Sequence, residues 1–120
     1  MNRQHVNMWT FFQDGLPEVQ VSGLEQVYKT NQEIHVSWLP LTTEITEDLI
    51  GYHVKIWLHK QDGRYVVGSS VDSESVPLAV NNFRFSSMES NSIYKVSVSV
   101  ENVRGKGEET IIGLFLVLHL

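Results

Sequence analysis

Five histidines are the side chains of this chain best suited to bind a metal ion. His53 and His59 fall on one expected strand but are six positions apart, about 20 Å at the rise of a β-strand. One zinc ion cannot join them, since its bonds to nitrogen are about 2 Å long. His5 and His119 lie near the chain ends, and His35 alternates with apolar residues that should face a core. We therefore expect solvated histidines and no metal site.

The residues needed for nucleophilic or phosphate chemistry do not occur in a recognisable arrangement. The chain has no cysteine and no G-x-S-x-G motif. Its grouped carboxylates stand in an expected loop, at Glu44, Glu47 and Asp48, and at an expected strand start, Glu108-Glu109. Gly105-Lys106-Gly107 is too short for a phosphate-binding loop. We expect no catalytic residue, no cofactor and no enzymatic activity.

Composition limits the kinds of partner. The chain has 120 residues, of which 42% are hydrophobic and 19% charged, typical of one globular domain. Its net charge of -5, with no run of Lys or Arg, argues against nucleic-acid binding. The apolar carboxyl end spans only about ten residues, against the ~20 that cross a bilayer. We expect membrane association only through a segment outside this chain; oligomeric state stays open.

Short apolar alternations separated by turn residues predict β-strands. Ile34, Val36 and Trp38 share one face of the first clear strand, and Asp62-Gly63 predicts a tight hairpin after the longest. That longest strand should run from Ile50 to His59, with Ile50, Tyr52, Val54, Ile56 and Leu58 inward. Further strands are expected at Tyr65–Val67, about Leu78–Phe85, Tyr94–Val100 and about Glu108–Leu118, with a looser segment at Ser69–Val76.

Four motifs in the expected order resemble the fibronectin type III domain from about Pro17 to Leu118. They are Trp38 on the second strand, G-Y-x-V-x-I-W at 51–57, the spacing of Phe85, Met88 and Tyr94, and N-x-x-G-x-G at 102–107. Met88, Ser90 and Ser92 depart from the leucine, proline and threonine of that pattern. The resemblance implies an all-β, seven-stranded immunoglobulin-like sandwich, with Tyr94 as its corner tyrosine. The implied core residues are Trp38, Tyr52, Phe85, Met88, Tyr94, Val96 and Val98.

The first sixteen residues predict a separate unit. Val6–Thr10 is typical of the end of a final strand, and Gln13–Pro17 of a short linker. We interpret residues 1–16 as the tail of a preceding module and its linker, and residues 17–120 as the fibronectin type III domain. A stretch without a structural partner is the alternative.

The resemblance also suggests where a protein could bind. The outer face of the larger sheet should carry His53, Lys55, Trp57, His59 and Lys95, with a tryptophan anchor among polar groups. Packing of Trp57 against its own strand neighbours or the amino-terminal segment is the alternative. The last hairpin adds Arg104 and Lys106, but its R-G-K sequence lacks the aspartate of an integrin-binding R-G-D. The loop 41–49 is a third candidate.

The function implied is that of a non-catalytic protein-interaction and spacer module in a tandem array. The run at 51–57 resembles modules of neural immunoglobulin-superfamily adhesion proteins of the contactin and L1 type, and of receptor tyrosine phosphatases. That places the chain on the extracellular side of the plasma membrane, and no W-S-x-W-S box of cytokine receptors is present. Two alternatives stay open: an intracellular module of a filament or scaffold protein, and an accessory domain of a secreted glycoside hydrolase. Residues 111–120 are either the last strand or the start of a membrane segment.

Overall fold

The computed structural model describes residues 15–29, 33–42, 48–68 and 70–117, and their regular structure is entirely β. Within these ranges no helix is long and apolar enough to cross a membrane. The strands are β1 (Glu25–Lys29), β2 (Ile34–Ser37), β3 (Leu49–Gln61), β4 (Arg64–Tyr65), β5 (Ser70–Pro77), β6 (Asn82–Phe85), β7 (Ser92–Asn102), β8 (Gly105–Lys106) and β9 (Thr110–Val117).

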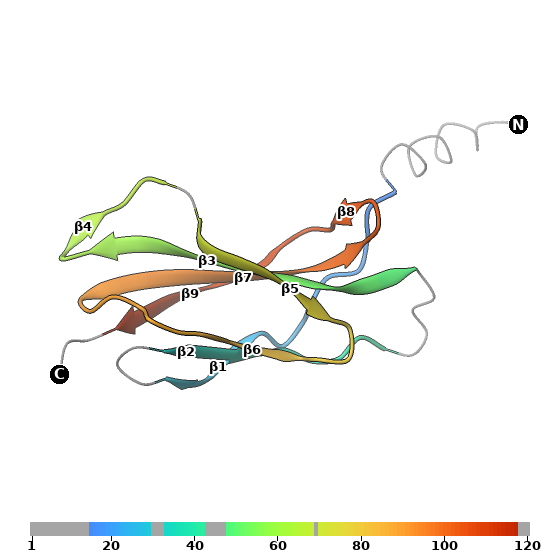
Figure 1. Ribbon diagram of the computed structural model, residues 1–120, viewed down its shortest axis with the longest axis horizontal. Helices are drawn as coiled ribbons and strands as arrows, with labels where there is room; N and C mark the ends of the chain where they lie inside the picture. The colour runs from blue at the N-terminus through green and yellow to red at the C-terminus, as the bar shows by residue number, and fades with distance from the viewer. Residues whose placement is uncertain (1–14, 30–32, 43–47, 69, 118–120) are drawn as a thin grey trace, which may run out of the picture.

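Two antiparallel sheets face each other as the layers of a sandwich (Figure 1). The smaller sheet has the order β1-β2-β6, and the larger is built on the β3–β7 pair. Strand β5 pairs with the edge of β3 that faces away from β7, and β9 pairs with the edge of β7 that faces away from β3. In the described part of the chain, β4 and β8 are two-residue strands beside seven longer ones. The all-β immunoglobulin-like sandwich expected from the sequence is confirmed.

The core lies between the inner faces of the two sheets, where apolar side chains alternate along β2, β3 and β7. Trp38, just after β2, packs edge-on against Tyr52 of β3, with ring centroids 5.2 Å apart. The seven residues that the resemblance implied for the core are all buried: Trp38, Tyr52, Phe85, Met88, Tyr94, Val96 and Val98.

Tyr94 joins β7 to the loop that precedes it. Its ring is buried, and its hydroxyl accepts a hydrogen bond from the backbone N–H of Glu89 at 2.9 Å. The phenol oxygen thus has a partner while the ring fills the core. This is the corner geometry that the sequence predicted for Tyr94.

The turn between β3 and β4 has the predicted hairpin form. Lys60 pairs with Tyr65 and Gln61 with Arg64, leaving two residues in the turn. Asp62 has φ 51° and Gly63 has φ 81°, so both occupy the left-handed region that primed turns require.

Two strand predictions near β3 were wrong in detail. Ile50 was expected in the core, but a bulge between Leu49 and Gly51 interrupts the alternation there. The side chain of Ile50 is consequently 54% exposed. The predicted strand at Tyr65–Val67 ends at Tyr65, because only Arg64 and Tyr65 pair with β3.

The segment after this hairpin also differs from the prediction. The stretch expected to be looser, Ser69–Val76, contains most of β5, which pairs with β3 from Gly51 to Trp57. Its polar sequence hides the strand because an edge strand buries few side chains. The strand expected from Leu78 begins only at Asn82, since Val80 and Pro77 form a hydrogen-bonded turn. The last predicted strand is observed as Thr110–Val117.

Candidate protein-binding face

The outer face of the larger sheet brings together side chains from β5, β3, β7 and β9. His53 on β3 is paired with Ser75 of β5 and Ser99 of β7. Two residues along, Lys55 is paired with Ser73 and Ser97. Small serines therefore flank the longer side chains of β3 on both sides.

Lys55 is held in an ion pair on this face. Its Nζ lies 2.7 Å from Glu109 Oε2, and Ser97 Oγ donates to the same oxygen at 3.2 Å. The hydrogen bond from Lys55 lowers the pKa of Glu109 below its ordinary value of 4.5, against an opposing effect of burial. Both charged side chains are about one-third exposed or less, so the pair is only partly screened by water.

His53 lies on the same face, among two lysines and two glutamates. Burial lowers its pKa below the ordinary value of 6.5, and the positive charges of Lys106 and Lys55 act in the same direction. Glu101 and Glu109 oppose this shift. The imidazole is therefore kept neutral to lower pH than a free histidine.

Trp57 is half-buried two residues further along β3 on the same face. Its backbone pairs with Ser70 and Lys95. The Lys55 ammonium lies 5.4 Å from the centroid of its ring, within cation–π range. Trp57 thus packs partly on its own strand while leaving ring surface available to a partner.

His59 belongs to the far end of β3 and not to the group around Trp57. A bulge between Leu58 and Lys60 interrupts the pairing with β7 at that point. The imidazole packs edge-on against Tyr65, with centroids 5.3 Å apart. We call Trp57, Lys55 and Lys95 the Trp57 row, and we exclude His59 from it.

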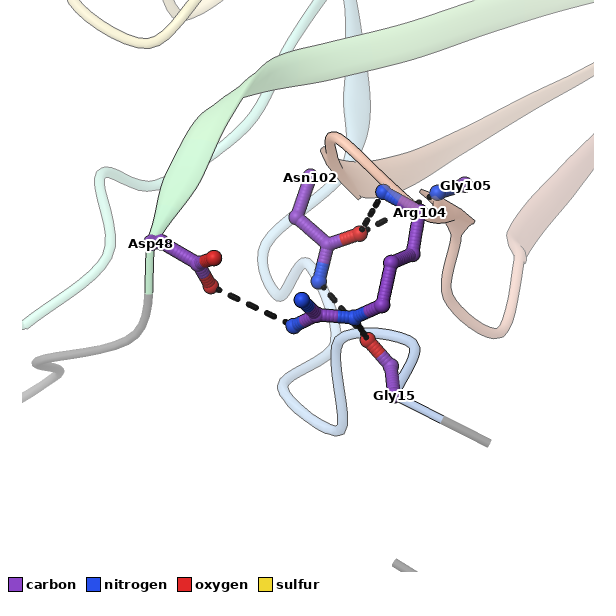
Figure 2. Close-up of polar contacts among 5 residues, drawn as sticks. All are labelled: Gly15, Asp48, Asn102, Arg104 and Gly105. Atoms are coloured by element: carbon purple, nitrogen blue, oxygen red, sulfur yellow. Dashed lines mark hydrogen bonds and ion pairs between the residues drawn. The ribbon is translucent and has the colours of Figure 1, made fainter. Parts of the chain in front are cut away.

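Arg104 is directed toward the start of the described chain (Figure 2). Its Nε donates to the Gly15 carbonyl, and one terminal nitrogen lies 3.5 Å from Asp48 Oδ1. The backbone of Lys106, two residues on, is paired with that of Glu101 between β8 and β7, and the positive charge of Lys106 lowers the pKa of His53. The structure therefore separates the two hairpin cations, placing Lys106 by the face and Arg104 at the end of the sandwich.

Asn102 completes this second site. Its buried side chain donates from Nδ2 to the Gly15 carbonyl at 3.0 Å (Figure 2). Its Oδ1 accepts from the backbone N–H groups of Arg104 and Gly105 at 2.8 and 3.1 Å. We call Gly15, Asn102 and Arg104 the Gly15 clamp. Sequence reasoning recognised Asn102 only as a turn residue, because its partner is 87 positions away.

Several polar residues of the face could be placed only by the sheet register. Ser97 and Ser99 are the β7 partners of Lys55 and His53, yet each is only 1% exposed beneath longer neighbours. Glu109 was noted only as one of two carboxylates at an expected strand start, although it neutralises Lys55. The sequence shows a cation on β3, Lys55, and a carboxylate just before β9, Glu109. Only the strand order β3-β7-β9 brings the two side chains together.

The described residues contain no group of three or more His, Cys, Asp and Glu side chains that could hold a metal ion. Of the loop proposed as a third surface, residues 43–47 lie outside the described ranges. Asp48 at its end contacts Arg104. Residues 1–14 of the predicted preceding tail also lie outside them.

The family of the chain follows from comparison with known proteins. The family model of the fibronectin type III domain matches residues 19–112. The chain therefore belongs to the fibronectin type III family. Domains of this family are in general non-catalytic modules that mediate protein–protein contacts. The comparison with curated proteins found no match.

Solved structures share the same fold at low sequence identity. The third fibronectin III domain of human KIAA0343 protein is 17% identical, with a TM-score of 0.71, covering 89% of this chain and 87% of that one. The fn3 domain of human contactin 1 is 16% identical, with a TM-score of 0.68 and coverage of 87% and 82%. The fn3 domain of human collagen alpha-1(XX) is 20% identical, with a TM-score of 0.65 and coverage of 86% and 89%.

Proposed function

We propose that this domain is a protein-interaction and spacer module of a tandem array in a cell-surface adhesion protein or receptor. The observation that carries the proposal is the row of Trp57, Lys55 and Lys95 on the outer face of the larger sheet. A half-buried tryptophan beside cationic and polar groups has the composition of an interface anchor with a polar rim. His53 and Lys106 extend the face at one end.

The charges of the face indicate the chemistry of the partner. Glu109 neutralises Lys55, whereas Lys95 and Lys106 have no ion pair among the described residues. A partner surface with an apolar pocket for Trp57 and carboxylates at its edge would complement this arrangement. Integrin recognition of the R-G-D kind is not proposed, because Lys106 stands where the aspartate would be.

A cell-aggregation assay with the domain displayed on the cell surface tests this proposal. Truncation of a central aromatic anchor typically costs at least about 2 kcal/mol of binding energy. We therefore expect Trp57→Ala to abolish most of the aggregation without unfolding the domain. The matched control is Tyr65→Ala, which removes an exposed aromatic ring on β4, away from the Trp57 row.

Unchanged aggregation by a folded Trp57→Ala domain would remove this face from the proposal. Loss of aggregation with Tyr65→Ala but not with Trp57→Ala would indicate that the partner binds at the β3–β4 hairpin instead.

Two other settings for the same module remain as alternatives: an intracellular filament or scaffold protein, and an accessory domain of a secreted glycoside hydrolase. The fold and the face are compatible with each. Neighbouring domains in the full-length protein distinguish them, since an adhesion protein requires a secretory signal and a membrane anchor in the same polypeptide.

A further inference from the structure

Three consecutive apolar residues are exposed where the β3–β4 hairpin leaves the larger sheet. The exposed fractions are 70% for Tyr65, 37% for Val66 and 99% for Val67. Soluble proteins usually expose such side chains singly, whereas a contiguous exposed run marks a contact surface. We call these three residues the apolar tip.

The hairpin holds the apolar tip in place. The backbone N–H of Val66 donates to the His59 carbonyl at 2.9 Å, directly after the pairing of Tyr65 with Lys60. The Tyr65 ring packs edge-on against the His59 imidazole, with centroids 5.3 Å apart. The exposure of the tip is therefore a property of the folded hairpin.

The apolar tip lies at one end of the larger sheet. Figure 1 shows the hairpin that contains β4 at one end of the long axis of the molecule. The register agrees, since Gln61 before the turn pairs with Ser92 at the start of β7, whereas Leu49 pairs with Asn102 at the other end of that strand. A surface can therefore meet the tip end-on.

Two cations stand beside the apolar tip. Lys60 and Arg64 make no ion pair among the described residues, and the Lys60 ammonium lies 4.5 Å from the centroid of the Tyr65 ring. Asp62 is the one carboxylate between residues 59 and 68, so this hairpin has an excess of positive charge although the chain as a whole has a net charge of -5. Salt screens charges beyond about 8 Å at physiological ionic strength, so a bound surface senses mainly the local charge.

We propose that the apolar tip inserts into the surface of a lipid membrane that contains anionic headgroups. Val66 and Val67 reach the boundary between headgroups and acyl chains, and the Tyr65 ring lies at the level of the headgroups. Lys60 and Arg64 contact the lipid phosphates. The contact is peripheral and needs no spanning segment.

The size and shape of the tip favour a membrane over a protein partner. Three side chains provide only part of the ~800 Å² that each partner buries in a standard protein interface. A lipid surface accepts a convex apolar tip without a matching pocket. This inference does not rest on the proposed adhesion function, because it involves no residue of the Trp57 row.

Vesicle binding by the full 120-residue chain tests this proposal. We expect the chain to sediment with vesicles of phosphatidylcholine and phosphatidylserine, and less with vesicles of phosphatidylcholine alone. Val67→Glu should weaken binding to the mixed vesicles by about tenfold or more, because it removes the transfer of a valine side chain into an apolar phase. The matched control is Val103→Glu, which adds the same charge at a residue 73% exposed at the opposite end of the sheet.

A fluorescent dye shows which part of the domain inserts. The chain has no cysteine, so Val67→Cys and Val103→Cys each provide a single attachment point for an NBD group, whose fluorescence rises in apolar surroundings. We expect the mixed vesicles to raise the fluorescence at position 67 and not at position 103. High salt should release the chain from the vesicles.

No binding to the mixed vesicles would overturn the proposal, as would equal losses with Val67→Glu and Val103→Glu. Equal binding to the two kinds of vesicle would contradict the role of Lys60 and Arg64. Attachment to cells that is abolished by protease treatment of those cells, without binding to vesicles, would indicate a protein partner and also overturn the proposal. Both substituted positions are exposed, and circular dichroism verifies that each variant is folded.

Discussion

At the scale of single residues, Asn102 joins the start of the described chain to the end of β7. Its buried amide bonds to one carbonyl and two backbone N–H groups. We expect Asn102→Ala to lower the free energy of unfolding by about 1–3 kcal/mol, since buried partners lose hydrogen bonds. Urea denaturation measures the change. The exposed Asn82→Ala should cost less than about 0.5 kcal/mol, and equal costs for the two variants would contradict this role.

His53 gives the domain a specific pH dependence. Because the folded pKa of His53 is lowered from 6.5, the unfolded chain takes up a proton at higher pH than the folded one. The contribution of His53 to stability is therefore complete above pH 6.5 and is lost as the pH falls through 6.5 toward the folded value.

We expect the urea midpoint of the wild-type domain to fall between about pH 7.5 and about pH 5.5 more steeply than that of His53→Gln. Parallel pH dependences for the two proteins would show that His53 is not perturbed in the fold.

At the scale of elements, the β3–β4 hairpin depends on the backbone conformation of its turn. Gly63 has φ 81°, and an added Cβ would meet no atom within 4 Å. Gly63→Ala should therefore cost about 1 kcal/mol through backbone strain alone. Gly68 is equally open but does not have a positive φ, so Gly68→Ala should leave stability unchanged or slightly raised. Thermal unfolding distinguishes the two; a stable Gly63→Ala domain would disprove the argument.

The strands that could be predicted are those with one buried face. Ile34 and Val36 on β2, and Val96 and Val98 on β7, alternate because the opposite sheet covers every second position. Strand β5 gave no such signal, since pairing with β3 and not burial defines it. Ile50 was misplaced because a bulge shifts the alternation by one residue, which depends on the partner strand.

At the scale of the whole molecule, the family and its sandwich architecture could be predicted, but the neighbours of each surface side chain could not. His53, Lys55 and Trp57 were identified as one face because they alternate on a single strand. The pairing of Lys55 with Glu109 depends on how β9 registers on β7. The separation of Arg104 from Lys106 depends on the contact with Gly15, which no local pattern encodes.

The described chain begins and ends at opposite ends of β7. Gly15 is bonded to Asn102, at one end of that strand, and Val117 pairs with Ser92, at the other. The 11 residues of β7 separate these points by roughly 33 Å. A pulling force applied at Gly15 and Val117 would thus act along the strands, and the hydrogen bonds between β9 and β7 would be loaded together in shear and not opened one at a time. The Gly15 clamp would bear that force first, which makes it the mechanical attachment point of the domain.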